Sequence, residues 1–281
     1  MIRNWKDKTV IITGASAGVG KACAEEFARL GAKLVLVART PKPLRAVCES
    51  LSDKTSVISV AMDVSDSTEC LNLLRKTEFE HGAVHCLVNN AGFHERGPVE
   101  SIDAQQLAQM IDVNLRAPIL LSRLILPYLR KSGGGSIVNV ASLAGCTPVA
   151  GAATYSASKF GLRAFSQSLA DELRGSSIHV GCVSPGPIDT GFIMDEIDNV
   201  TDITFSQPMS TAKEVAEAVV SVASGQRPEI KMPWISGPLT TLSYLFPALR
   251  RALKPLLEKK GRKAKDFYRQ RARNSQSGQD S

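Results

Sequence analysis

Short apolar runs of strand length alternate with amphipathic stretches along most of this chain. The runs are nearly uninterrupted in hydrophobic residues, which is typical of strands buried on both faces. They span residues 9–13, 33–38, 56–61, 85–89, 136–140 and 178–183. Apolar residues repeat at helical spacing between them, over residues 20–30, 43–51, 68–79, 104–131 and 154–174. This alternation predicts parallel strands joined by right-handed crossovers.

The expected fold is therefore a single-domain α/β protein, a doubly wound parallel sheet of the Rossmann type with helices on both faces. Ligands of such sheets bind at the carboxyl ends of the strands, where the strand order reverses. The helix over 104–131 is expected to break near Pro118, and another helix is expected over 210–223. Only residues 229–234 offer a last strand.

The composition limits where such a protein could work. Its 281 residues, 43% of them hydrophobic, suit one large core. No stretch reaches the roughly 18 uncharged apolar residues that a membrane-spanning helix needs. Residues 1–8 are polar and run directly into the first strand, which leaves no room for a signal peptide and predicts an intracellular, cytoplasmic protein. The six cysteines are scattered and the four histidines show no metal motif, so we expect reduced thiols and no metal site.

The C-terminal residues differ from the rest, and we expect a domain over 1–237 followed by an extension over 238–281. Residues 249–281 hold 11 Lys/Arg against 3 Asp/Glu, a balance of +8 within a chain whose formal charge is +7. Residues 239–257 mix leucine and aromatic residues with Arg250, Arg251 and Lys254. The charged residues past Glu258 are expected to be disordered.

Two interpretations fit this extension. One is peripheral contact with an anionic membrane surface, for which an apolar segment with basic residues is suited. The other is packing of residues 239–257 on the protein's own body, with a solvated charged end. Nucleic-acid binding is not expected, because no aromatic-rich basic platform accompanies the charge.

A glycine-rich turn follows the first strand and opens directly into a helix. Its residues are Thr13-Gly14-Ala15-Ser16-Ala17-Gly18-Val19-Gly20. Glycines let the backbone approach a diphosphate closely, and the helix N-terminus presents free N–H groups and a partial positive charge. The turn therefore predicts a dinucleotide site that involves Gly14, Ser16, Gly18, Val19 and Gly20.

With this turn, the chain resembles the short-chain dehydrogenase/reductase family, whose fingerprint includes Thr-Gly-x-x-x-Gly-x-Gly. Further motifs carry the resemblance in the family's order, over residues 7–225. They are Asn89-Asn90-Ala91-Gly92, Ser142, Tyr155-Ser156-Ala157-Ser158-Lys159 and Pro185-Gly186-Pro187-Ile188-Asp189-Thr190. The resemblance implies adenine contacts from Asp63 and Val64, although Asp63 also suits the N-cap of the next helix. It implies further cofactor contacts from Asn90, Ala91, Gly92, Tyr155, Lys159, Pro185, Gly186, Ile188 and Thr190.

The choice between NADP(H) and NAD(H) depends on the end of the second strand. An acid there binds the ribose 2′-hydroxyl, and a base accepts a 2′-phosphate. Ala38 stands where the family's NAD users carry the acid, and Arg39 follows it. A guanidinium can grip a phosphate with two hydrogen bonds, so NADP(H) is favoured. The alternative is that Arg39 is merely a solvated arginine, since Ala17 lacks the second basic residue of many NADP-dependent members.

The expected chemistry is hydride exchange between NADP(H) and a carbonyl or secondary alcohol, with Tyr155 as proton donor and acceptor. Tyr155 and Lys159 are four residues apart on one helix face, and the ammonium should lower the pKa of the phenol. Ser142 is placed to donate to the substrate oxygen. The resemblance assigns Asn114 to a water relay that connects Lys159 to solvent.

Residues 190–209 correspond to the family's substrate lid and contain Phe192, Ile193, Met194, Ile197, Ile203, Phe205 and Met209. These side chains suit an apolar, lipid-like substrate, or they simply pack the lid onto the core. A catalytically silent dinucleotide sensor is the alternative function on this fold, although Ser142, Tyr155 and Lys159 argue against it. Family members commonly form homo-oligomers through the helices at 104–131 and 154–174.

Overall fold

The computed structural model describes residues 2 and 4–277, with side chains up to Gln270. Within that range seven strands form one parallel sheet in the order β3-β2-β1-β4-β5-β6-β7. The strands are β1 (Thr9–Thr13), β2 (Lys33–Ala38), β3 (Val57–Ala61), β4 (Cys86–Asn89), β5 (Gly135–Val140), β6 (Ile178–Pro185) and β7 (Glu229–Met232). The order reverses between β1 and β4, so the doubly wound sheet predicted from the sequence is confirmed.

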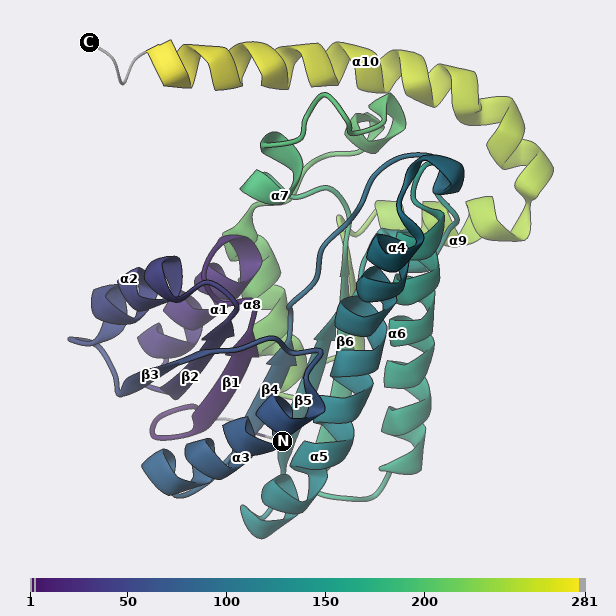
Figure 1. Cartoon of the computed structure of the whole chain (residues 1–281). Helices are drawn as coiled ribbons and strands as arrows, with labels where there is room; N and C mark the ends of the chain where they lie inside the picture. The colour runs from purple at the N-terminus through teal and green to yellow at the C-terminus, as the bar shows by residue number, and fades with distance from the viewer. Residues whose placement is uncertain (1, 3, 278–281) are drawn as a thin grey trace.

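Helices cover both faces of this sheet (Figure 1). One apolar core lies under α1 (Gly18–Arg29), α2 (Pro41–Leu51) and α8 (Ala212–Ala223). The other lies under α3 (Ser67–His81), α5 (Ala117–Lys131) and α6 (Ala153–Glu172). The remaining helices are α4 (Ala104–Ile111), α7 (Gly191–Met194), α9 (Ser236–Leu245) and α10 (Pro247–Ser277), with single turns η1 (Val99–Ser101), η3 (Leu143–Gly145) and η4 (Asp202–Ser206).

The long helix expected over 104–131 is interrupted just before Pro118, close to the predicted break. The interruption is a π-helical turn, η2 (Asp112–Arg116), which joins α4 to α5. Pro118 lies in the first turn of α5, directly after the π turn, and it has no N–H to donate to the preceding turn. The π turn places Asn114 in the interior between α4, α5 and α6.

The extension is also more ordered than its charge suggests. The composition past Glu258 predicts disorder, but the structure continues α10 through Ser277. Gly261 allows α10 to lie against η4, since a Cβ there would be 1.8 Å from the carbonyl oxygen of Asp202. Lys265, only 5% exposed, donates from Nζ to the carbonyl oxygens of Val200 (2.6 Å) and Asp198 (3.2 Å). These contacts supply a tertiary partner that composition alone cannot reveal.

The path of the extension is visible in Figure 1, where α10 crosses over the segment that contains α7. Among the described residues, no helix has the length and apolar character needed to cross a membrane. All six cysteines lie in the described chain as free thiols, as expected, and five of them are buried.

Candidate active site

One large cavity opens at the carboxyl ends of the strands. Its volume is about 1870 Å³, and its wall runs from the glycine-rich turn to α9 and α10. Most residues expected at the site lie along it: Gly14, Ser16, Gly18, Val19, Arg39, Asp63, Val64, Asn90, Ala91, Gly92, Ser142, Tyr155, Lys159, Pro185, Gly186, Ile188 and Thr190. Two expected residues, Gly20 and Asn114, lie behind the wall and support it.

The glycine-rich turn is built tightly enough that larger residues cannot replace its glycines. Gly14 has φ +66°, and a Cβ on Gly20 would be 2.1 Å from the carbonyl oxygen of Gly14. Asn90 Nδ2 donates to the carbonyl oxygens of Thr13 (2.9 Å) and Gly14 (3.2 Å), which ties the turn to the loop after β4. Because α1 begins after Ala17, which has no polar side chain for capping, the first N–H groups of α1 suit an external anion. This cradle fits the diphosphate of a dinucleotide.

The side of the cavity beyond β2 and β3 carries Arg39 and Asp63. Asp63 accepts hydrogen bonds from the Ser65 N–H (2.8 Å) and hydroxyl (2.7 Å). Burial alone would raise the pKa of Asp63, but these bonds and the charge of Arg39 hold it below its usual value. The N-cap of α3 is Asp66, so the alternative capping role of Asp63 is wrong.

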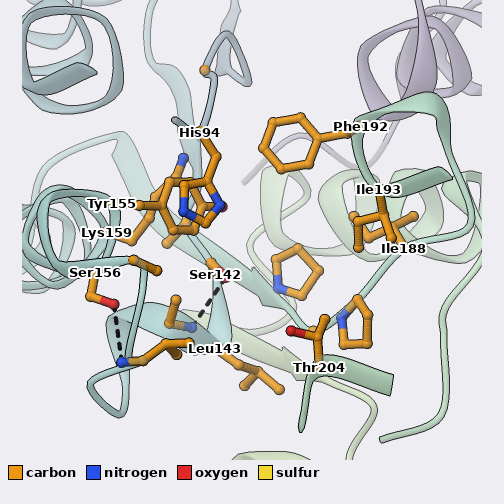
Figure 2. A pocket seen from close by; sticks show the side chains of 18 of the residues that line it. His94, Ser142, Leu143, Tyr155, Ser156, Lys159, Ile188, Phe192, Ile193 and Thr204 are labelled. Atoms are coloured by element: carbon orange, nitrogen blue, oxygen red, sulfur yellow. Dashed lines mark hydrogen bonds between the residues drawn. The ribbon is translucent and has the colours of Figure 1, made fainter. Parts of the chain in front are cut away.

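Tyr155 and Ser142 both line the cavity, and the Ser142 hydroxyl lies close enough to the phenol to lower its pKa. Tyr155 lies on α6, and Ser142 follows β5, where its Oγ also accepts from the Ala144 N–H at 3.1 Å. Lys159 Nζ donates to the Val140 carbonyl oxygen at 3.0 Å and lies 5.8 Å from the centre of the Tyr155 ring. Figure 2 shows these side chains gathered on one side of the cavity.

The pKa of Tyr155 differs from the sequence expectation. Burial raises it above the usual value, and the Ser142 hydroxyl and the charge of Arg96 offset this rise only in part. The ammonium of Lys159 is directed at the Val140 carbonyl oxygen, and its expected lowering of the phenol pKa stays a prediction. Burial lowers the pKa of Lys159 itself to about 8. At neutral pH the pair is therefore a phenol and an ammonium.

Asn114 ties the loop after β4 to η2. Its Nδ2 donates to the Phe93 carbonyl oxygen (2.9 Å), and its Oδ1 accepts from the Phe93 N–H (3.0 Å). A Cβ on Gly92 would be 2.9 Å from this Oδ1 and 3.5 Å from Lys159 Nζ. Asn114 thus lies beside Lys159, and its role in a water relay stays a prediction.

His94 is a site residue that the sequence analysis considered only as a metal ligand. Its ring stacks on Tyr155, with centroids 4.2 Å apart and planes 15° apart (Figure 2). Arg96 Nη1 lies 2.8 Å from His94 Nδ1 and can only donate, so Nδ1 accepts and Nε2 carries the proton. Burial, reinforced by Arg96 and Lys159, lowers the pKa of His94 to about 3. The available signal was its position, immediately after the Asn89–Gly92 motif.

Arg96 connects this loop to the lid segment, residues 190–209. Its Nε lies 3.0 Å from Glu196 Oε2, and its Nη2 donates to the Phe192 carbonyl oxygen at 2.8 Å. The guanidinium also lies 5.5 Å from the centre of the Phe192 ring. Arg96 therefore links the lid segment to His94, whose ring stacks on Tyr155.

The apolar side chains of the lid segment divide between two tasks. Phe192, Ile193 and Ile203 line the cavity. Phe205, with Ile197, Val200 and Met209, packs on Ala264 and Tyr268 of α10. The packing alternative is therefore correct for the second group, with the C-terminal helix as the partner. The apolar substrate stays a prediction. Within the described residues, no group of three His, Cys, Asp or Glu side chains is placed to hold a metal ion.

The comparison with known proteins agrees with this geometry. The family model described as short chain dehydrogenase matches residues 8–201. The chain belongs to this family. Short-chain dehydrogenases bind a nicotinamide dinucleotide, and membership makes this protein a dehydrogenase or reductase.

Several known short-chain dehydrogenases are similar to this chain. Dehydrogenase/reductase SDR family member 7B of Danio rerio is 30% identical over 264 residues, covering 88% of this chain and 84% of its own. A metagenomic short-chain oxidoreductase, solved in complex with NADP, has a TM-score of 0.69 and 32% identity over 81% of this chain and 97% of its own. Levodione reductase shares the fold, with a TM-score of 0.76 at 24% identity over 84% of this chain and 99% of its own.

Proposed function

We propose that this short-chain dehydrogenase exchanges a hydride between NADP(H) and an apolar carbonyl compound or secondary alcohol, with Tyr155 as the proton donor and acceptor. The observation that carries the proposal is that Tyr155 and Ser142 line one cavity, with the Ser142 hydroxyl close enough to the phenol to lower its pKa. Both face the same cavity as the glycine cradle after β1. A reacting carbon held there would have a dinucleotide on one side and a proton donor on the other.

The dinucleotide, when bound, would supply the hydride that reduces the carbonyl carbon. Tyr155 donates its phenolic proton to the carbonyl oxygen as the alkoxide forms. The raised pKa of Tyr155 keeps its phenol protonated at neutral pH. Ser142 donates a hydrogen bond to the same oxygen. Lys159, charged below about pH 8, places a positive charge beside the phenolate that remains. Asn114 would hold the water that returns a proton to the site.

The preference for NADP(H) rests on Arg39. Its exposed side chain follows β2 at the cavity wall, on the side where Asp63 lies. A guanidinium in that place can bind a 2′-phosphate with two charge-assisted hydrogen bonds. The metagenomic relative, at 32% identity, was solved with NADP, which supports the same choice here.

An apolar substrate fits the rest of the wall. Phe192, Ile193 and Ile203 of the lid segment line the same cavity as Leu239 and Leu242 of α9. Such walls favour compounds with an extended hydrocarbon portion. Homo-oligomer formation through α4–α5 and α6, and a cytoplasmic location, stay predictions from the sequence.

The test is oxidation of NADPH and NADH in the presence of a panel of ketones, aldehydes and quinones with hydrocarbon chains of increasing length. Turnover that favours NADPH and improves with chain length supports the proposal. Tight NADPH binding without turnover of any panel member, in either direction, would instead indicate the dinucleotide sensor.

A further inference from the structure

Exposed apolar side chains are concentrated in one short stretch of the chain. Of the fifteen large hydrophobic residues that are exposed in the part of the chain with described side chains, ten lie between residues 234 and 256. They are Trp234, Ile235, Leu239, Leu242, Tyr244, Leu245, Phe246, Leu249, Leu253 and Leu256. An apolar patch of this density is unusual for a surface that faces water. We call residues 234–257 the apolar rim.

The apolar rim surrounds the mouth of the cavity. Seven of its exposed residues also line the cavity: Trp234, Ile235, Leu239, Leu242, Tyr244, Leu249 and Leu253. A side chain that is exposed and lines the cavity lies where the cavity opens. Leu249, Leu253 and Leu256 recur at spacings of four and three residues, so they lie along one face of α10. The apolar outer surface is therefore continuous with the wall that leads to Tyr155.

The second half of α10 holds the apolar rim in place through contacts with the lid segment, and these contacts leave the rim side chains exposed. Lys265 is buried against Val200 and Asp198, and Gly261 lies against Asp202. Arg269 adds an ion pair with Asp198 at 2.6 Å. These contacts anchor α10 to the lid segment, whereas the first half of the helix projects its leucines outward.

Basic side chains accompany the apolar rim. Arg251, Lys254, Lys259 and Lys260 are exposed on α10, and Glu258 is the acidic residue among them. The 33 residues from 249 onward carry 11 Lys/Arg and 3 Asp/Glu, while the formal charge of the whole chain is +7. The rest of the protein is therefore close to neutral. Apolar side chains flanked by lysine and arginine match the boundary between anionic headgroups and acyl chains.

We propose that the apolar rim docks on an anionic lipid bilayer and admits an apolar substrate from the membrane directly into the cavity. The substrate class rests on the proposed function, but the docking does not. A hydrocarbon compound dissolved in the bilayer would reach Tyr155 along apolar walls without crossing water. The membrane thereby becomes the source of the substrate, and α9 and α10 form the entrance.

The test exploits the two tryptophans. Trp5 is 4% exposed and packed in the core, whereas Trp234 is 80% exposed at the cavity mouth. We expect vesicles of phosphatidylcholine with phosphatidylglycerol to shift the tryptophan fluorescence of the full-length protein to shorter wavelength. Brominated acyl chains should quench this fluorescence. The protein should also float with these vesicles. Vesicles of phosphatidylcholine alone should bind less, and added salt should weaken the anionic binding.

A triple variant separates docking from catalysis. Leu245→Ser, Phe246→Ser and Leu256→Ser alter exposed rim residues that do not line the cavity. Partitioning onto anionic vesicles should fall at least ~100-fold, since three apolar side chains lose their burial in lipid. Phe79→Ser is the matched control, because Phe79 is 87% exposed on α3, away from the rim, and should leave partitioning unchanged.

Equal vesicle binding by the wild type and the triple variant, or no binding by the wild type, overturns the proposal. The proposal is also overturned if the wild type is a dimer, the triple variant is a monomer and neither binds vesicles. The rim would then be an interface between copies of this chain. If docking depends on the apolar rim but the protein oxidises neither NADPH nor NADH, the docking proposal stands. The proposed function is then rejected.

Discussion

The imidazole of His94 lies parallel to the phenol of Tyr155, with ring centroids 4.2 Å apart. Arg96 holds this imidazole through Nδ1 and also binds Glu196 and the Phe192 carbonyl oxygen of the lid segment. One chain of contacts therefore runs from Tyr155 on α6 through the loop after β4 to the lid segment.

His94→Phe should reduce the loss of stability in acid. Because burial lowers the pKa of folded His94 to about 3, only the unfolded state binds a proton as pH falls below 6.5. Stability from the neutral imidazole is present above that pH and is lost toward pH 3. Between about pH 7 and about pH 5, the free energy of unfolding should fall by about 2 kcal/mol more in the wild type than in the variant. Urea unfolding at the two pH values measures this, and identical losses would contradict the assignment.

Tyr155→Phe should abolish turnover while NADPH binding is retained. The substitution removes the phenolic hydroxyl but keeps the ring that stacks on His94. Loss of a general acid should lower kcat by about 10²–10⁴-fold. Fluorescence titration should give a Kd for NADPH close to the wild-type value. Tyr128→Phe, on α5, is the matched control, and parallel loss of binding and turnover would refute the role.

Arg39→Asp should reverse the cofactor preference. An acid after β2 repels a 2′-phosphate and can accept from a 2′-hydroxyl, so affinity for NADPH should fall and that for NADH should rise. The ratio of the two dissociation constants should change by about 100-fold. Arg45→Asp, exposed on α2 and away from the cavity wall, serves as the control. An unchanged ratio in Arg39→Asp would leave this arginine as a solvated side chain.

Lys265→Met should loosen the lid segment. The carbonyl oxygens of Val200 and Asp198 would lose their buried donor, at a cost of about 1–3 kcal/mol. Amide hydrogen exchange over residues 198–206 should accelerate by roughly 10- to 100-fold. Lys263→Met makes the same change at an exposed position on α10 and should have little effect. Equal exchange in the two variants would show that α10 does not anchor the lid.

Local patterns were sufficient to predict the sheet and most of the cavity wall. Strands buried on both faces leave continuous apolar runs, and a tight approach of backbone segments requires glycine at Gly14 and Gly20. Tyr155 and Lys159 share a helix face because of their spacing. Each of these features is encoded within a few neighbouring residues.

Contacts between distant residues were decided by the tertiary structure. Arg96 and Glu196 are 100 positions apart, and Lys265 reaches Val200 across 65. Neither pair leaves a periodic signal, so the sequence could not predict the lid connection or the helix past Glu258. The direction of the Tyr155 pKa also depends on burial, which the Tyr-x-x-x-Lys spacing does not encode. The sequence by itself determined the fold, the glycine-rich cradle and the polar side chains expected to react, because short-range periodicity and backbone geometry specify them. Only the tertiary structure decided that His94 covers the phenol, that α10 anchors the lid segment and that the cavity opens at the apolar rim. These features depend on packing between segments far apart in the chain.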